Sequence, residues 1–228
     1  MLKAVLFDLD QTLIDFMKMK HMCVTNSVDA MIDAGLKMKR AEAEKILFNL
    51  YEKYGIEYQK IFNVFLKKVL KKIDYKILAA GISSYRKTKV AYLEPYPHVI
   101  PTLTELKRRG LKLAIISDAP RLQVWIRLCD LKLHHLFDVV ITLGDVKVRK
   151  PAARPFLKAL EMLHIMPSEA IVVGDNPKRD IAGAKRLGIK TCLASYGWKW
   201  IDYKRTGRGA IKADYKISDI SELLKIVK

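Results

Sequence analysis

The chain has 228 residues, of which 50% are hydrophobic and 29% are charged, a balance typical of folded proteins and not of disordered ones. No apolar run approaches the roughly 20 residues that span a bilayer, and the first residues lack the long apolar stretch of a signal peptide. We therefore expect a cytoplasmic protein without a membrane partner. The cysteines Cys23, Cys129 and Cys192 are too few and too far apart to predict a disulfide framework or a zinc site.

The net charge of +18 raises the question of a nucleic-acid partner. The excess is not concentrated in one arm or block. Residues 16–93 contain 16 Lys and Arg against 7 Asp and Glu, which is half of the net charge. This even spread indicates a solvated, lysine-rich surface, so we do not expect nucleic acid as the main partner.

Residues 3–7 form a short apolar run that predicts a buried strand. From residue 16 to residue 92 the pattern changes to proline-free segments rich in Lys, Met, Leu and Ala. Apolar residues recur there at helical spacing, as in Val24, Val28 and Met31. This region therefore predicts a small bundle of helices whose apolar stripes form its core.

The stretch Glu94-Pro95-Tyr96-Pro97 ends the helical region, and short apolar runs then alternate with helical segments. Such alternation predicts right-handed crossovers and a parallel sheet covered by helices on both faces. We predict a doubly wound, Rossmann-like α/β core of residues 1–15 and 93–228, interrupted by an all-helical cap domain of residues 16–92. The predicted strands are residues 113–116, 139–141, 171–173 and 191–193, and the predicted helices are residues 98–109, 120–129, 152–163, 178–187 and 219–227.

Polar residues follow three of these strands at the point where each strand ends. They are, in chain order, Asp8 and Asp10, Ser117 and Asp118, and Gly174-Asp175 with Asp180 five residues later. Because ligands bind at the carboxyl ends of parallel strands, we expect these side chains to converge. Crowded carboxylates repel one another unless a cation neutralises them, and an all-oxygen ligand set suits Mg²⁺.

Lys150 precedes Pro151, which disfavours helix at the lysine and suits the first position of a helix. The lysine is thereby expected on a loop at a helix start, where its ammonium can reach an anion. Asp8 and Asp10 are two residues apart and can divide the work of phosphoryl transfer. Asp8 would attack phosphorus, while Asp10 would protonate the leaving group and then activate water.

Each of these residues also has a purely structural interpretation. For Asp118 we favour it, as a helix cap next to Pro120. For the others it stays open as an alternative: a turn cap for Asp8 and Asp10, a helix cap for Ser117, a solvated surface position for Lys150, and a surface ion pair with Lys178 or Arg179 for Asp180.

Four segments, in this order, resemble the motifs of the haloacid dehalogenase-like hydrolase superfamily, in its phosphatase branch. The first is Val5-Leu6-Phe7-Asp8-Leu9-Asp10-Gln11-Thr12-Leu13, an apolar strand followed by Asp-x-Asp-x-Thr. The second is Ile115-Ile116-Ser117, the third is Lys150-Pro151, and the fourth is Gly174-Asp175 with Asp180. The resemblance covers residues 3–228.

The resemblance implies a magnesium-dependent phosphatase that acts on a small phosphorylated metabolite. The phosphoryl group would pass through an aspartyl-phosphate on Asp8, with Asp10 as general acid and base. Mg²⁺ would be bound by Asp8, by Asp175 and by the backbone carbonyl of Asp10.

The resemblance also implies a phosphate site formed by Ser117 and Lys150. Thr12, Gly174 and Asp180 would support the site, and Asp180 would hold Lys150 or the waters of the metal. Residues 16–92 would form the cap that this family carries between its first and second motifs, closing over the site and excluding water.

Two positions depart from the usual pattern: Gln11 stands where many members have glycine, and Ala153 replaces the usual proline two residues after Lys-Pro. A sugar-phosphate mutase, which would use the same Asp8 and Asp10, is the alternative enzyme. A basic nucleic-acid-binding module is the alternative without catalysis, and the intact catalytic set argues against it. The sequence leaves the substrate and the oligomeric state open.

Overall fold

The computed structural model of the protein describes residues 1–198 and 211–227. The chain forms two compact units, one of Met1–Met17 with Glu94–Lys228 and the other of Lys18–Leu93. These boundaries, at residues 17/18 and 93/94, lie one or two residues after the predicted ones at 15/16 and 92/93. We describe the first unit as the core and the second as the helical unit.

The core is built on a parallel sheet with the strand order β3-β2-β1-β4-β5-β6. Its central strand, β1, is buried throughout, which explains why its sequence is an uninterrupted apolar run. Phe7 at the end of β1 pairs with Ile115 of β2 and Val173 of β4, so these three strands end at the same edge. The strands are β1 (Ala4–Phe7), β2 (Lys112–Ser117), β3 (Val139–Thr142), β4 (Ala170–Gly174), β5 (Lys190–Ala194) and β6 (Tyr215–Ile217).

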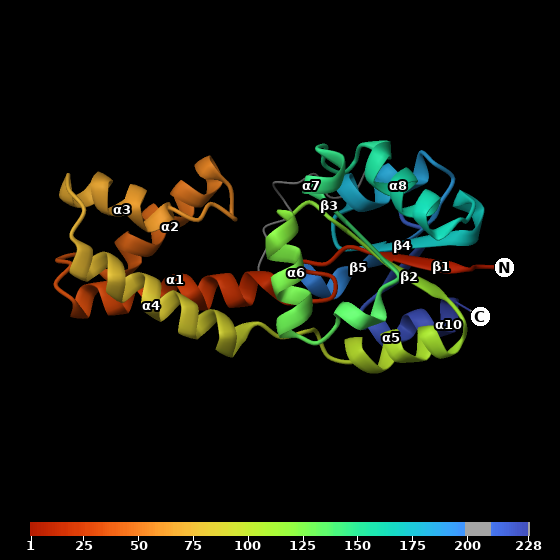
Figure 1. The fold of residues 1–228 in the computed structure, drawn as a ribbon, viewed down its shortest axis with the longest axis horizontal. Coiled ribbons are helices and arrows are strands. Elements are labelled where there is room, and N and C mark those ends of the chain that lie inside the picture. The colour runs from red at the N-terminus through yellow and green to blue at the C-terminus, as the bar shows by residue number, and fades with distance from the viewer. Residues whose placement is uncertain (199–210, 228) are drawn as a thin grey trace. The chain divides into compact units, whose positions relative to one another are not determined.

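Helices cover both faces of this sheet, with α5 and α10 on one side and α8 on the other (Figure 1). A buried cluster between α8 and the sheet includes Phe156 and Leu160 of the helix and Leu6 and Val172 of the strands. The α-helices of the core are α5 (Val99–Arg108), α6 (Arg121–Asp130), α7 (Leu143–Val146), α8 (Ala153–Leu163), α9 (Ala182–Lys185) and α10 (Leu223–Ile226). The doubly wound fold expected from the alternating pattern is thus confirmed.

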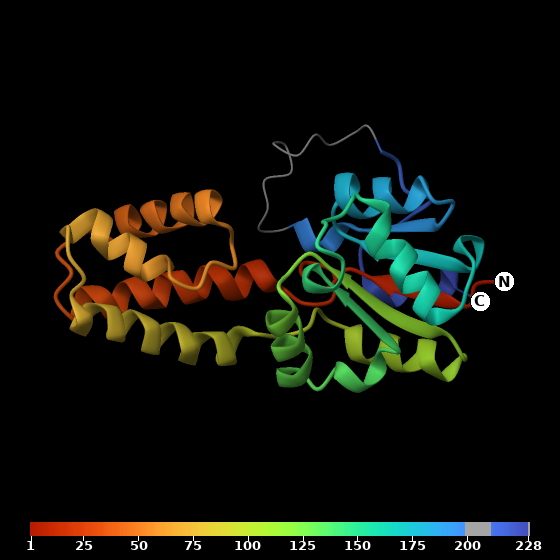
Figure 2. The same ribbon diagram turned by 45° about the horizontal axis from the view of Figure 1, so that its top comes forward.

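The helical unit consists of four helices packed side by side (Figure 2). Its core includes Val24, Val28 and Met31, the stripe expected at helical spacing, together with Phe65 and Leu47 from two other helices. The helices are α1 (Phe16–Asp33), whose first two residues belong to the core, α2 (Arg40–Tyr54), α3 (Ile61–Leu70) and α4 (Tyr75–Tyr92). No helix in the described part of the chain has the length and hydrophobicity that a membrane span requires.

Three details of the core differ from the sequence-based expectation. The helix expected at residues 178–187 is a π-helical turn, η3 (Pro177–Ile181), followed by the short α9; the Asn176 side chain caps the turn by accepting hydrogen bonds from the amides of Lys178 and Arg179. The C-terminal helix begins as a 3₁₀ turn, η6 (Ile220–Glu222). The strand β6 was not expected, since its three residues contain no apolar run; it forms by pairing along the edge of β5.

The remaining short turns connect these elements without forming layers of their own. They are the 3₁₀ turns η1 (His134–Leu136), η2 (Pro167–Glu169) and η4 (Ser195–Trp198). Of these, η4 follows β5 directly and brings Gly197 to the loop after β1, where its carbonyl meets the Gln11 side chain.

Candidate active site

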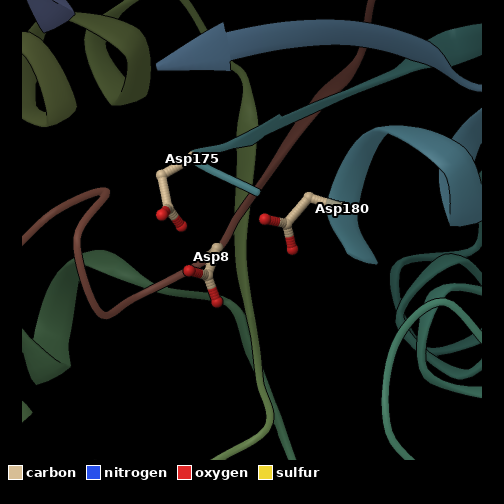
Figure 3. A group of neighbouring side chains, drawn as sticks. All are labelled: Asp8, Asp175 and Asp180. Carbon is tan, nitrogen blue, oxygen red and sulfur yellow. The ribbon is translucent and has the colours of Figure 1, made fainter. Parts of the chain in front are cut away.

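Three buried aspartates converge at the carboxyl edge of the sheet (Figure 3). Asp8 follows β1, Asp175 follows β4, and Asp180 lies in the turn η3. One carboxylate oxygen from each lies within 4.8 Å of the other two. Three carboxylates this close are a ligand set for a hard divalent cation, because carboxylate oxygens are the donors that Mg²⁺ prefers. The residues present therefore fit a magnesium ion.

Lys150 is the buried cation of this cluster, with 5% of its surface exposed. Its ammonium lies 2.6 Å from a carboxylate oxygen of Asp8 and 2.6 Å from one of Asp180, and it donates to the carbonyl of Ile116 at 2.8 Å. Burial alone would lower the pKa of Lys150, but the neighbouring carboxylates outweigh it and hold the pKa above its ordinary value. The lysine therefore stays charged between the two aspartates.

The charge balance of the cluster leaves room for a further cation. Burial raises the pKa of Asp8 to about 7, even though the ammonium of Lys150 acts in the opposite direction. Among the three buried aspartates and Lys150, negative charge is in excess. A divalent cation beside Asp8 would remove that excess and keep its carboxylate ionised, as a nucleophile must be.

Asp118 positions Lys150, and its expected role as a helix cap is wrong. One of its carboxylate oxygens accepts the backbone amide of Lys150 at 3.0 Å, and the other lies 3.5 Å from the guanidinium of Arg179. Helix α6 begins after Pro120 without any side-chain cap. Asp118 instead holds the lysine loop through the backbone amide of Lys150.

Ser117 and Thr12 line the same edge of the sheet. The Ser117 hydroxyl is buried and accepts the amide of Ala119 at 3.2 Å, which fixes its oxygen at the end of β2. The Thr12 hydroxyl lies 3.5 Å from a carboxylate oxygen of Asp8, at the outer limit of a hydrogen bond. The Thr12 hydroxyl directs its proton to Asp8, and the Ser117 hydroxyl, which accepts in its bond with Ala119, can donate its proton to an anion.

Gly174 allows Asp180 to reach the cluster. A Cβ atom at residue 174 would lie 2.5 Å from the Cβ and Cγ atoms of Asp180, closer than any side chain tolerates. Asp180 in turn accepts the amide of Asn176 at 2.9 Å, which fixes its second oxygen. The surface ion pair considered for Asp180 is replaced by a buried one with Lys150.

Asp10 is not part of the three-aspartate cluster. Its carboxylate, 24% exposed, accepts a hydrogen bond of 2.9 Å from Arg127 of α6. The Arg127 guanidinium also lies 4.4 Å from the ring centre of Phe16. Sequence reasoning missed Arg127, because a single arginine on an amphipathic helix carries no signal that it points inward.

A family model described as haloacid dehalogenase-like hydrolase matches residues 5–194. The chain belongs to this family. A glyceraldehyde 3-phosphate phosphatase of Methanocaldococcus jannaschii is 39% identical to it, and the match covers 100% of this chain and 98% of the relative. Such relatives assign the chain to the phosphatase branch of the family.

Solved structures of family members share its fold. A haloacid dehalogenase-like phosphatase from Thermococcus onnurineus superposes with a TM-score of 0.71 at 29% identity, covering 99% of this chain and 98% of the other. A putative β-phosphoglucomutase from Thermotoga maritima reaches a TM-score of 0.74 at 20% identity, with both chains covered completely. At that lower identity the second likeness concerns the fold alone.

Gln11, which departs from the glycine common in this family, forms three hydrogen bonds that tie distant segments to the loop after β1. Its amide nitrogen donates to the Tyr96 hydroxyl at 3.2 Å and to the carbonyl of Gly197 at 2.8 Å. Its amide oxygen accepts the backbone amide of Met17, in the first turn of α1, at 2.7 Å. Gln11 therefore braces both places where the chain leaves and re-enters the core.

This bracing has a cost, since Gln11 adopts the left-handed conformation that glycine tolerates best, with a φ of 64°. We expect Gln11→Ala to destabilise the protein by about 2–4 kcal/mol, because it loses three hydrogen bonds and keeps the strained backbone. Gln11→Gly should cost about 1 kcal/mol less, since glycine relieves the strain. Urea unfolding of both variants measures the difference, and an alanine variant as stable as the parent would show that the hydrogen bonds contribute nothing.

Proposed function

We propose that the protein is a magnesium-dependent phosphatase that hydrolyses a small phosphomonoester through an aspartyl-phosphate on Asp8. The observation that carries this proposal is the buried carboxylate of Asp8, held 2.6 Å from the Lys150 ammonium beside two further aspartates. Asp175 and the backbone carbonyl of Asp10 would complete the ligands of Mg²⁺ together with Asp8. Once bound, the ion would neutralise charge on the phosphoryl oxygens.

In the first half of the proposed reaction, a carboxylate oxygen of Asp8 forms a bond to phosphorus as the bond from phosphorus to the leaving oxygen breaks. Asp10 donates its proton to that leaving oxygen, so the product departs as an alcohol. In the second half, Asp10 takes a proton from water, and the water oxygen attacks phosphorus. Phosphate leaves and the Asp8 carboxylate is restored.

The phosphate would be held by Ser117 and Lys150 at the ends of β2 and of the lysine loop. Both side chains are buried, and the low local dielectric strengthens their interaction with an anion. Thr12, Asp180 and Gly174 support this arrangement, since Asp180 shares the ammonium with Asp8 and Gly174 leaves space for it.

We propose glyceraldehyde 3-phosphate, or a phosphorylated metabolite of similar size, as the substrate. The support is the full-length relative at 39% identity that carries the name of this activity. The helical unit, residues 16–92 by the sequence analysis, is proposed to act as the cap, and the reaction is proposed to take place in the cytoplasm.

The test is phosphate release from a panel of glyceraldehyde 3-phosphate, phosphorylated sugars and acids, nucleotides and p-nitrophenyl phosphate. Each substrate is assayed with Mg²⁺ and with EDTA. We expect release only with Mg²⁺, because without it the negative charge of three aspartates opposes the approach of a phosphate dianion. Glyceraldehyde 3-phosphate should have the highest kcat/KM of the panel.

Four outcomes would contradict the proposal in different ways. Equal phosphate release in EDTA would exclude a requirement for Mg²⁺. Failure of the folded protein to release phosphate from any substrate would exclude phosphatase activity. Transfer of the phosphoryl group to a second hydroxyl of a sugar phosphate, through a bisphosphate, would identify a mutase. Binding to nucleic acid that weakens steeply with salt, without phosphate release, would favour the basic binding module.

A further inference from the structure

Arg127 is a fully buried arginine whose position in the core is not explained by packing. It lies on α6 with its side chain 2% exposed, between the buried apolar residues Val124 and Leu128 on the same helix face. A leucine or methionine would complete that apolar face. Burying a guanidinium is costly, so the reason for an arginine must lie in what its charged end contacts.

The charged end contacts Asp10 and Phe16. One nitrogen of the guanidinium donates to a carboxylate oxygen of Asp10 at 2.9 Å, and its central carbon lies 4.4 Å from the centre of the Phe16 ring. A charge-assisted hydrogen bond is shorter and stronger than a neutral one, and the ring face restrains the guanidinium plane. Arg127 is therefore held in one orientation, and it fixes one oxygen of Asp10.

The backbone around Asp10 is already fixed by the turn that follows β1. The amide of Gln11 donates to the carbonyl of Ile14 at 2.8 Å, and the amide of Leu13 donates to the carbonyl of Leu9 at 2.9 Å. These bonds set the path of the main chain, and the contact with Arg127 restrains the Asp10 side chain.

We propose that Arg127 is the positioning residue of the general acid and base, Asp10. The hydrogen bond from Arg127 would hold the Asp10 carboxylate in the orientation from which it exchanges a proton with the leaving oxygen of the substrate. This inference rests on the proposed function, because the orientation of Asp10 matters only if Asp10 transfers protons. Arg127 itself does not touch the substrate in this proposal.

The proposal predicts that replacing Arg127 lowers kcat/KM by a factor that depends on the leaving group of the substrate. An alkoxide is a poor leaving group and needs the proton of a well-placed acid, whereas 4-nitrophenolate departs without one. kcat/KM reports the steps up to departure of the leaving group, so it isolates the acid step from the later attack of water. A general loss of structure would lower kcat/KM by the same factor for a substrate with an alkoxide leaving group and for one with a 4-nitrophenolate leaving group.

The experiment compares kcat/KM of the full chain for glyceraldehyde 3-phosphate and for p-nitrophenyl phosphate, with Mg²⁺ present. We expect Arg127→Met to lower the first by roughly 10–100-fold and the second by about threefold or less. Arg127→Lys keeps the charge but not the planar guanidinium, so it should recover part of the loss and lower the first value by roughly 3–10-fold.

Arg121→Met is the matched control, because Arg121 lies on the same helix, is exposed, and pairs with Asp145. It should leave both values unchanged. Thermal unfolding is recorded for every variant, and where Arg127→Met does not fold, Arg127→Lys carries the test. An equal loss on both substrates, or no loss, would overturn the proposal for Arg127, whereas a parent protein that releases no phosphate would overturn the proposed function and this inference with it.

Discussion

Replacing Asp8 by asparagine is expected to abolish phosphate release, lowering kcat by on the order of 10⁴-fold or more. The amide oxygen of asparagine is a far weaker nucleophile than a carboxylate, so the bond to phosphorus does not form. The fold should persist, because the variant removes one of three crowded buried carboxylates while Lys150 keeps its ion pair with Asp180. Steady-state phosphate release and thermal unfolding measure the two effects.

The covalent step can be observed directly. Acid quenching of the parent protein during turnover, followed by mass spectrometry of its peptides, should find one phosphoryl group on the peptide that contains Asp8. The Asp8→Asn protein should carry none. Asp130→Asn is the matched control, since Asp130 is an exposed aspartate at the end of α6. An Asp8→Asn protein that retained more than about one hundredth of the activity would exclude Asp8 as the nucleophile.

Asp8 and Asp175 could be found from the sequence because each follows a strand that is easy to recognise. The apolar runs before Asp8 and Asp175 have no polar interruption, as strands buried on both faces require. Parallel pairing then brings the ends of those strands together whatever the details of packing. The strand pattern was therefore enough to predict that Asp8 and Asp175 lie close together.

The contacts around the cluster could not be found in the same way, because they depend on side-chain directions and on partners far away in sequence. Gln11 contacts Gly197, which is 186 residues later. Asp118 resembled a helix cap next to a proline, and only the fold shows that the lysine loop lies beside it. Arginine side chains are mostly exposed, whereas the contact of Arg127 with Asp10 lies inside the core.

Replacing Lys150 by methionine is expected to reduce both stability and activity. Methionine fills much of the same space, but it leaves Asp8 and Asp180 buried without their shared ammonium, 2.6 Å from each in the parent protein. Removing one partner of a buried ion pair costs about 3–5 kcal/mol, since the remaining charge is uncompensated. Urea unfolding without metal measures that loss, and kcat should fall by roughly 100-fold or more because the phosphate also loses a cation.

Adding Mg²⁺ distinguishes the contribution of Lys150 to stability from its contribution to the reaction rate. A cation bound by the aspartates would neutralise the charge that the lysine leaves behind, and binding at 100 times its Kd adds about 2.7 kcal/mol to the free energy of unfolding. The Lys150→Met protein should therefore regain stability with Mg²⁺ but not its rate, because the ion does not replace the ammonium at the phosphate. Lys158→Met, at a half-exposed lysine paired with Glu161, is the matched control and should change neither. If Lys150→Met is as stable as the parent without metal, the aspartates do not depend on the lysine for neutralisation; if its rate returns with its stability, Lys150 has a structural role alone.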